Sequence, residues 1–215
     1  MASKVLKLKQ DYGSELTRLL NLSFETRASA QHYEGAMSRE LEERLGPQES
    51  DRVRAAEAAN WADTEMDKLR TKYDSLELEL RVAIDEALQA AEQELAPTDI
   101  STEAVLLTTK MSEQDLIDSM DAASGLGEVG VQTIKLLLSA ARRKDGYDLA
   151  IAHALELLPD LRDAYDDVLL AAEELDPNDE PGEKWEMFAA DSPSPADILG
   201  MSGPQHDLNI YSRMR

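Results

Sequence analysis

Residues 55–90 read AAEAANWADTEMDKLRTKYDSLELELRVAIDEALQA, and a regular apolar pattern runs through all of them. Small or apolar side chains recur at alternating spacings of four and three residues: Ala55, Ala59, Ala62, Met66, Leu69, Tyr73, Leu76, Leu80, Ala83, Ala87 and Ala90. A mean period of about 3.5 residues is typical of a helix that packs along another helix, as in a coiled coil. The pattern therefore predicts one long helix with a continuous buried seam.

A packing partner for this helix precedes it in the chain. We expect a first helix to begin between residues 11 and 14, with these residues on its apolar face: Leu16, Leu20, Phe24, Ala30, Tyr33, Met37, Leu41 and Leu45. Gly46 and Pro47 should end it, and Ser50 should cap a second helix that ends near Leu95. Two long helices joined by about four residues pack antiparallel. Residues 1–96 are therefore predicted to form a long antiparallel helical hairpin.

Shorter helical patterns follow the hairpin. We expect helices over residues 101–110, 112–123, 131–143, 147–158 and 160–175, and no segment has a convincing strand pattern. Ser112, with Asp115 three residues later, has the spacing of a capping box, and Asp160 should cap the last helix. The sequence thus predicts an all-α protein in which residues 97–175 form a bundle of short helices.

From residue 176 onward the composition changes to prolines, acids and serines. Such a composition is typical of an extended or disordered segment, so residues 176–215 are predicted to be an acidic, proline-rich tail. Apolar residues interrupt it, and we interpret them as partner-binding anchors: Trp185, Phe188, Ile198, Leu199 and Met201. Trp185 and Phe188 would share one face of a helical turn. The alternative is that the tail packs back onto the chain's own helices.

A second apolar line begins beside the seam after Leu76. It consists of Leu78, Val82, Ile84, Leu88, Ala91 and Leu95. Because a two-helix hairpin cannot cover two faces of one helix, either residues 97–175 or another chain must cover this line. In the second case Leu78, Val82 and Leu88 are partner-binding residues.

The composition restricts the classes of partner. The chain has 44 acidic and 22 basic residues and a net charge of −22. This charge repels nucleic acid and anionic lipid and favours basic protein partners. The absence of cysteine excludes disulfides, thiol catalysis and cysteine-ligated zinc. Because we find neither a secretory signal nor an apolar run of about 18 residues, we expect a protein of the cytoplasm or of a viral particle.

One glycine-rich segment has the form of a known motif. Residues 125–130 read GLGEVG and match GxGxxG, but an acidic, helix-periodic segment precedes them instead of a buried strand. Gly125-Leu126-Gly127 also resembles the turn of the helix-hairpin-helix family, which would imply DNA binding through backbone amides. The likeness covers about 20 residues, and the basic residues expected near the turn are absent. We therefore expect an ordinary helix–helix turn and no cofactor.

Metal and catalytic motifs are not found in the sequence. The histidines, His32, His153 and His206, lie in separate segments and outside the HExxH and ExxH patterns. The carboxylate runs lack the spacing of a calcium loop, and we expect them to form a solvated helix face: Asp163, Asp166, Asp167, Glu173 and Glu174. We therefore predict no catalytic, cofactor-binding or metal-binding residues.

Three functional hypotheses remain. The first is a non-enzymatic structural or assembly protein, such as a scaffold, adaptor or assembly chaperone of a larger particle, for example a viral one. It would bind proteins, as a homo-oligomer or as a component of the assembly, without direct contact to nucleic acid or membrane. The alternative is an acidic inhibitor that mimics DNA and occupies a basic nucleic-acid-binding protein. The third is an enzyme with an unfamiliar helical site.

Overall fold

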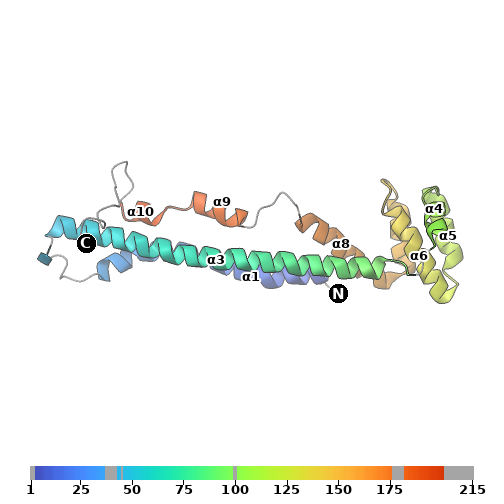
Figure 1. The fold of residues 1–215 in the computed structure, drawn as a ribbon, viewed down its shortest axis with the longest axis horizontal. Coiled ribbons are helices and arrows are strands. Elements are labelled where there is room, and N and C mark those ends of the chain that lie inside the picture. The colour runs from blue at the N-terminus through green and yellow to red at the C-terminus, as the bar shows by residue number, and fades with distance from the viewer. Residues whose placement is uncertain (1–2, 37–42, 45, 99–100, 176–181, 201–215) are drawn as a thin grey trace. The chain divides into compact units, whose positions relative to one another are not determined.

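The computed structural model describes residues 3–36, 43–44, 46–98, 101–175 and 182–200. Helices joined by turns make up these residues, and no strand occurs among them (Figure 1). The all-α prediction is therefore confirmed. The two long helices are α1 (Lys4–Ala36) and α3 (Pro47–Leu95).

Both long helices begin before their predicted starts. Helix α3 starts at Pro47, because the first turn of a helix leaves its N–H groups unpaired and tolerates proline there. Ser50 therefore lies inside α3 and is not its cap. Helix α1 starts at Lys4, where the buried Asp167 carboxylate accepts the N–H of Val5 at 3.0 Å and the hydroxyl of Ser3. Asp167, far along the chain, thus adds to the local cap, in which Oγ of Ser3 accepts the N–H of Leu6 at 3.3 Å.

The seam of α3 is confirmed, because all eleven of its predicted residues are buried or half-buried. The apolar face predicted for α1 needs correction, since Leu19 and Ser23 are buried whereas Phe24 is exposed. Leu16 and Leu20 are half-buried and Ala30 is buried. The other predicted members of that face, the side chain of Tyr33 and residues Met37, Leu41 and Leu45, lie outside the described part of the chain.

The chain divides into two compact units, and both are discontinuous in sequence. The first unit comprises residues 1–10 and 81–176, and the second comprises residues 11–80 and 177–215. This division differs from the boundaries at 96 and 175 that composition suggested. The unit boundaries after residues 10 and 80 lie inside α1 and α3. A unit can therefore end where neither the helix nor the composition changes.

The first unit contains the short helices. They are α4 (Thr102–Thr108), α5 (Glu113–Ala123), α6 (Gly127–Ala141), α7 (Asp148–Leu157), the 3₁₀ turn η1 (Pro159–Leu161) and α8 (Arg162–Glu174). Ser112 and Asp115 form the predicted capping box at the start of α5. Asp160 lies within η1 and does not cap α8, because Pro159 begins a 3₁₀ turn before that helix.

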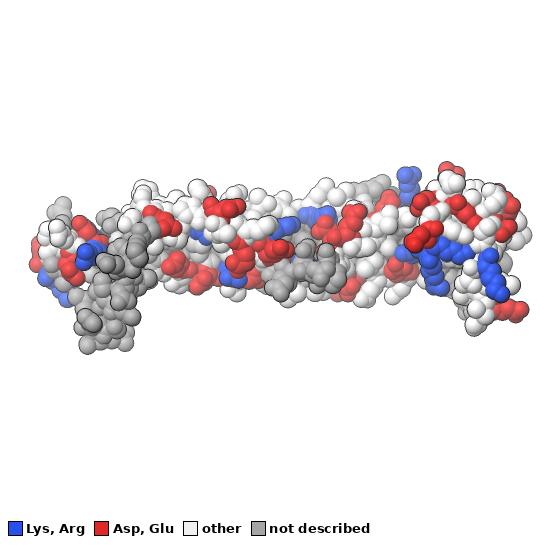
Figure 2. Space-filling view, turned by 90° about the horizontal axis from the view of Figure 1, so that it is seen from above, with Lys and Arg blue, Asp and Glu red and all other residues white. Residues whose placement is uncertain are grey.

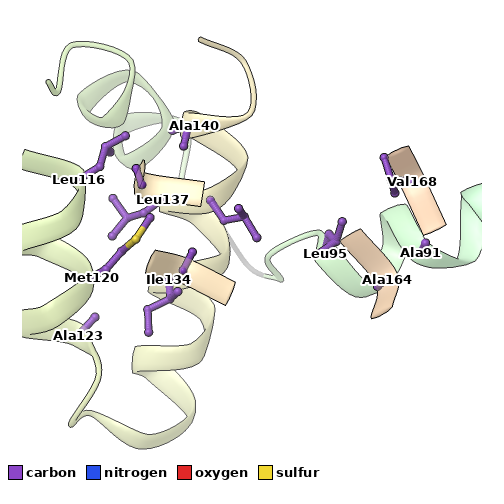
Figure 3. Packing of buried hydrophobic residues seen from close by; sticks show 14 residues of the cluster. Ala91, Leu95, Leu116, Met120, Ala123, Ile134, Leu137, Ala140, Ala164 and Val168 are labelled. Carbon is purple, nitrogen blue, oxygen red and sulfur yellow. The ribbon is translucent and has the colours of Figure 1, made fainter. Parts of the chain in front are cut away.

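An apolar cluster packs helices α5, α6, α7 and α8 together with the end of α3. Leu116 and Met120 of α5 face Ile134 and Leu137 of α6 (Figure 3). In the same cluster, Ala91 and Leu95 of α3 lie beside Ala164 and Val168 of α8 (Figure 3). The C-terminal part of α3 is therefore buried by helices that follow it in the chain.

The second unit combines parts of both long helices with the C-terminal segment. Leu19 of α1 packs on Tyr73 of α3, and Nε of Arg27 donates to Sδ of Met66 at 2.9 Å. Because residue numbers rise along α1 as they fall along α3, these contacts are antiparallel. Two short helices belong to this segment, α9 (Glu183–Asp191) and α10 (Pro195–Ile198), and α9 packs on α3 (Figure 1). The segment predicted to be extended is therefore helical in these two stretches.

Candidate protein-interaction surfaces

The second apolar line of α3 is covered only in part. Ile84, Ala91 and Leu95 are buried, and Leu88 packs against the cluster of the first unit. By contrast, the side chains of Leu78 and Val82 are 55% and 51% exposed. They lie four residues apart on one helix and so share a face. Of the three residues predicted to bind a partner here, Leu78 and Val82 are accessible and Leu88 serves internal packing.

Trp185 is a core residue of the second unit. It is only 3% exposed and contacts Leu19 of α1 and Tyr73 of α3. The rings of Tyr73 and Trp185 have centroids 5.5 Å apart and planes tilted by 49°. Half-buried leucines surround the three residues: Leu16, Leu20, Leu22, Leu69 and Leu76. At Trp185 the tail packs against the chain's own helices, which is the second of the two alternatives considered for it.

Polar contacts fix the start of α9 on α3. The N–H of Gly182 donates to Oε2 of Glu77 at 2.6 Å, and Arg70 forms an ion pair with Glu186. Gly182 has a φ of +89°, and an added Cβ would lie 2.8 Å from Oδ1 of Asp74. The carboxylate of Glu77 thus binds one of the N-terminal amides of α9, where negative charge is favourable.

Phe188 covers a buried cation. Arg27 is 4% exposed, and its Cζ lies 5.9 Å from the centroid of the Phe188 ring. The Nη1 atom of Arg27 is buried and has no hydrogen-bond partner. Burial lowers the pKa of Arg27, and the charge of Asp63 opposes that shift. Burial also raises the pKa of Asp63, and the charge of Asp67 raises it further. The charge of Arg27 lowers it.

The remaining tail residues are less buried. Ile198 and Leu199 are half-buried, and the carbonyl of Ile198 accepts a hydrogen bond from Nε2 of Gln31 at 3.2 Å. Ser194 and Asp197 form a capping box at the start of α10. Met201 lies outside the described residues. The structure thus brings Trp185, Phe188 and Ile198 onto one unit, together with Arg27 and Tyr73, to which the sequence pattern assigned no binding function.

A cavity of about 430 Å³ lies in the first unit beside the end of α6. Its lining combines apolar side chains of α3, α4 and α6 with Arg142, Arg143 and Lys144. Arg142 binds Glu92 through two hydrogen bonds of 2.9 and 3.1 Å, which lower the pKa of Glu92. Nζ of Lys144 donates to the carbonyl of Met111 at 2.5 Å. Arg142 and Lys144 therefore make polar contacts within the first unit.

The GxGxxG segment forms a tight helix–helix turn. A Cβ at Gly130 would lie 2.1 Å from the carbonyl oxygen of Ala123, so this glycine allows α5 and α6 to approach closely. The segment lies between two helices rather than after a strand. Close packing thus explains Gly130, and a φ of +60° explains Gly127.

His153 has a polar partner, because Oδ1 of Asp121 lies 2.7 Å from its Nε2. Within the described ranges, no three His, Asp or Glu side chains are grouped as a metal site would require. The helices of the same ranges include none that is both long enough and apolar enough to cross a membrane.

Acidic side chains are dispersed over the face seen in Figure 2. They form small groups between neutral and basic side chains instead of one continuous row. Phosphates along DNA are regularly spaced, so a surface that imitates them needs acids in regular rows. The visible face does not have that arrangement.

No family model, curated protein or solved structure matches this chain.

Proposed function

We propose that this chain is a non-enzymatic structural or assembly protein that acts through helix–helix contacts with other proteins. A scaffold, an adaptor and an assembly chaperone are the roles of this kind. The observation that supports the proposal is the docking of α9, around the buried Trp185, on residues of α1 and α3. A helical surface that accepts an amphipathic helix of its own chain has the shape needed to accept one from a partner.

The contacts of α9 are suited to exchange. One aromatic side chain is deeply buried, whereas Met187 is exposed and the ion pair between Arg70 and Glu186 is about half-exposed. Exposed ion pairs contribute only about 0–1 kcal/mol. The segment is tethered to the chain, so a partner helix must compete with an effective concentration on the order of millimolar. The C-terminal segment would therefore control access to the surface beneath it.

Leu78 and Val82 provide a second contact for assembly. Two exposed apolar side chains on one helix face are a suitable seam for another helix, from a second copy or from another component. With a net charge of −22, the chain would favour protein partners that carry basic surfaces, in the cytoplasm or in a viral particle. Nucleic acid and membrane are not partners in this proposal.

The same net charge favours a second candidate, an acidic inhibitor that mimics DNA. Such a protein would compete with double-stranded DNA for a basic binding protein, and the competition would weaken with salt. The dispersed acids on the face in Figure 2 give this candidate less support than helix docking receives.

A peptide with the sequence of residues 182–200, acetylated and amidated, tests the proposed function. It should bind saturably to the full chain carrying Trp185→Ala, because that substitution loosens the tethered segment and opens the surface. Binding to the unmodified chain should be at least about tenfold weaker, since the tethered segment competes. Met187→Ala is the control, because Met187 is exposed and its loss should not open the surface. Absence of saturable binding to the Trp185→Ala chain would contradict the proposal.

Light scattering at micromolar concentration tests the second contact. If Leu78 and Val82 join two copies, the full chain should exceed its monomer mass of 23.8 kDa, and Leu78→Lys should restore the monomer. A strict monomer for both proteins would contradict the homo-oligomer and leave only contacts with other proteins.

A further inference from the structure

Arg27 is a buried cation of the second unit that lacks a full set of hydrogen bonds. A guanidinium has five N–H donors and no acceptor, so full satisfaction requires several oxygen partners. Here Nε donates to Sδ of Met66, a weak acceptor, and Nη1 is buried without any partner. A buried charge without hydrogen bonds destabilises the state in which it occurs. Arg27 is therefore incompletely paired while α9 covers it.

The contact with the Phe188 ring compensates only in part for the missing hydrogen bonds of Arg27. The distance of 5.9 Å between Cζ of Arg27 and the Phe188 centroid lies at the outer limit of cation–π interactions, which extend to about 6 Å. Asp63 attracts the guanidinium without forming a hydrogen bond or ion pair with it. The position opposite Arg27 is thus filled by a side chain that cannot accept a hydrogen bond from Nη1.

We propose that the surface of α1 and α3 beneath α9 is a docking site for a partner helix that carries an aromatic residue and, three residues later, a carboxylate. The aromatic residue takes the place of Trp185 between Leu19 and Tyr73. The carboxylate takes the place of Phe188 and pairs with Arg27. This inference rests on the proposed function, and it specifies the chemistry of the helix that displaces α9.

The charge of Arg27, and not the net charge of the protein, favours a carboxylate at the position of Phe188. A carboxylate can accept a charge-assisted hydrogen bond from Nη1, which is stronger than a bond between neutral groups. The amide of glutamine has nearly the same shape but no charge. Glutamate and glutamine at the position of Phe188 therefore separate charge pairing from size and helix length.

The experiment uses variants of the 182–200 peptide and the full chain carrying Trp185→Ala. The Phe188→Glu peptide should bind about tenfold more tightly than the Phe188→Gln peptide. The matched control is the pair Met187→Glu and Met187→Gln, at an exposed neighbouring position, and there the two affinities should agree within about twofold. Adding Arg27→Gln to the protein should remove the difference at position 188.

The results separate the two proposals. Equal binding of the Glu and Gln peptides at position 188 overturns the inference, as does a preference for Glu that persists with Arg27→Gln or recurs at position 187. In these cases binding of the unmodified peptide leaves the proposed function intact. If no peptide binds, both are overturned.

A measurement within the intact chain covers the case in which Trp185→Ala prevents folding. Full chains with Phe188→Glu and Phe188→Gln are compared by amide hydrogen exchange of α9. The Glu chain should exchange about tenfold more slowly in α9, and Arg27→Gln should abolish the difference. Equal exchange rates overturn the inference.

Discussion

Tyr73 and Trp185 pack as a tilted aromatic pair, with ring centroids 5.5 Å apart, although one lies within α3 and the other in the C-terminal segment. Tilted pairs of this kind add about 0.5–1.5 kcal/mol to the stabilisation that burial alone provides. The pair joins α9 to α3, and both side chains are buried there, since Tyr73 is 1% and Trp185 3% exposed. The stability of that unit should therefore respond to changes in either residue.

Trp185→Ala should destabilise the chain by about 3–5 kcal/mol, because it leaves a cavity between Leu19 and Tyr73. Chemical unfolding followed by circular dichroism measures the change. Met187→Ala, two residues further along α9 and exposed, should change stability by less than about 0.5 kcal/mol. Similar small effects for both substitutions would mean that the segment does not contribute to the core and is free to act as a docking arm.

Stability should fall at high pH because of Tyr73. Burial, followed by the charges of Glu77 and Asp74, raises the pKa of Tyr73 to about 12, whereas an unfolded tyrosine titrates near 10. The folded state then binds more protons than the unfolded state between these values. The contribution of about 2–3 kcal/mol is complete below pH ~10 and is lost as pH rises through ~12. Tyr73→Phe should flatten this part of the curve of unfolding free energy against pH, and an unchanged slope would contradict the assignment.

Gly182→Ala should destabilise the start of α9 by about 1–2 kcal/mol, because its φ of +89° is strained for alanine. The added methyl group would also meet Oδ1 of Asp74. Gly125→Ala is a suitable control, since a Cβ added there would have no atom within 4 Å and the φ of Gly125 is not positive. Urea unfolding of the two variants gives the comparison. Equal losses would show that the geometry at Gly182 has no special cost.

Asp167→Ala should destabilise the chain by about 1–3 kcal/mol, because the N–H of Val5 and the hydroxyl of Ser3 lose their buried acceptor. The first turn of α1 has no acidic residue of its own, so Asp167 also supplies the favourable charge there. Its exposed neighbour in sequence, Asp166, allows a control away from the helix terminus, and Asp166→Ala should change stability by less than about 0.5 kcal/mol. The unfolding free energies of both variants test this.

Periodicity predicted the seam of α3 because that pattern depends on the helix alone. It was wrong for Phe24 of α1, although Leu16, Leu20 and Ala30 are buried or half-buried, and the geometry explains why. Leu16, Leu20 and Phe24 are spaced by four residues, and each such step rotates about 40° around a helix. The face therefore drifts, and Phe24 points to solvent while Leu19 and Ser23 are buried. Residues at alternating spacings of three and four, as in α3, remain on one side of the helix.

Contacts between distant segments could not be predicted from these patterns. Asp167 belongs to a run of acids typical of a solvated face, and only its proximity to Ser3 and Val5 makes it a cap. Trp185 lies among prolines and acids, and its partners Leu19 and Tyr73 are distant in sequence. Arg27 has no pattern that distinguishes it from other helix arginines. Local periodicity identifies which face is apolar, but not what covers it.

The discontinuity of the units has a consequence for synthesis on the ribosome. Helices α5, α6 and α7 contact one another closely and are close in sequence, so the nascent chain can assemble them early. The second unit cannot be completed in this way, because residues 11–80 must await residues 177–215. Until residues 177–215 have been synthesised, the face of Tyr73 that Trp185 finally covers remains open. During that interval, a helix from another protein meets no tethered competitor.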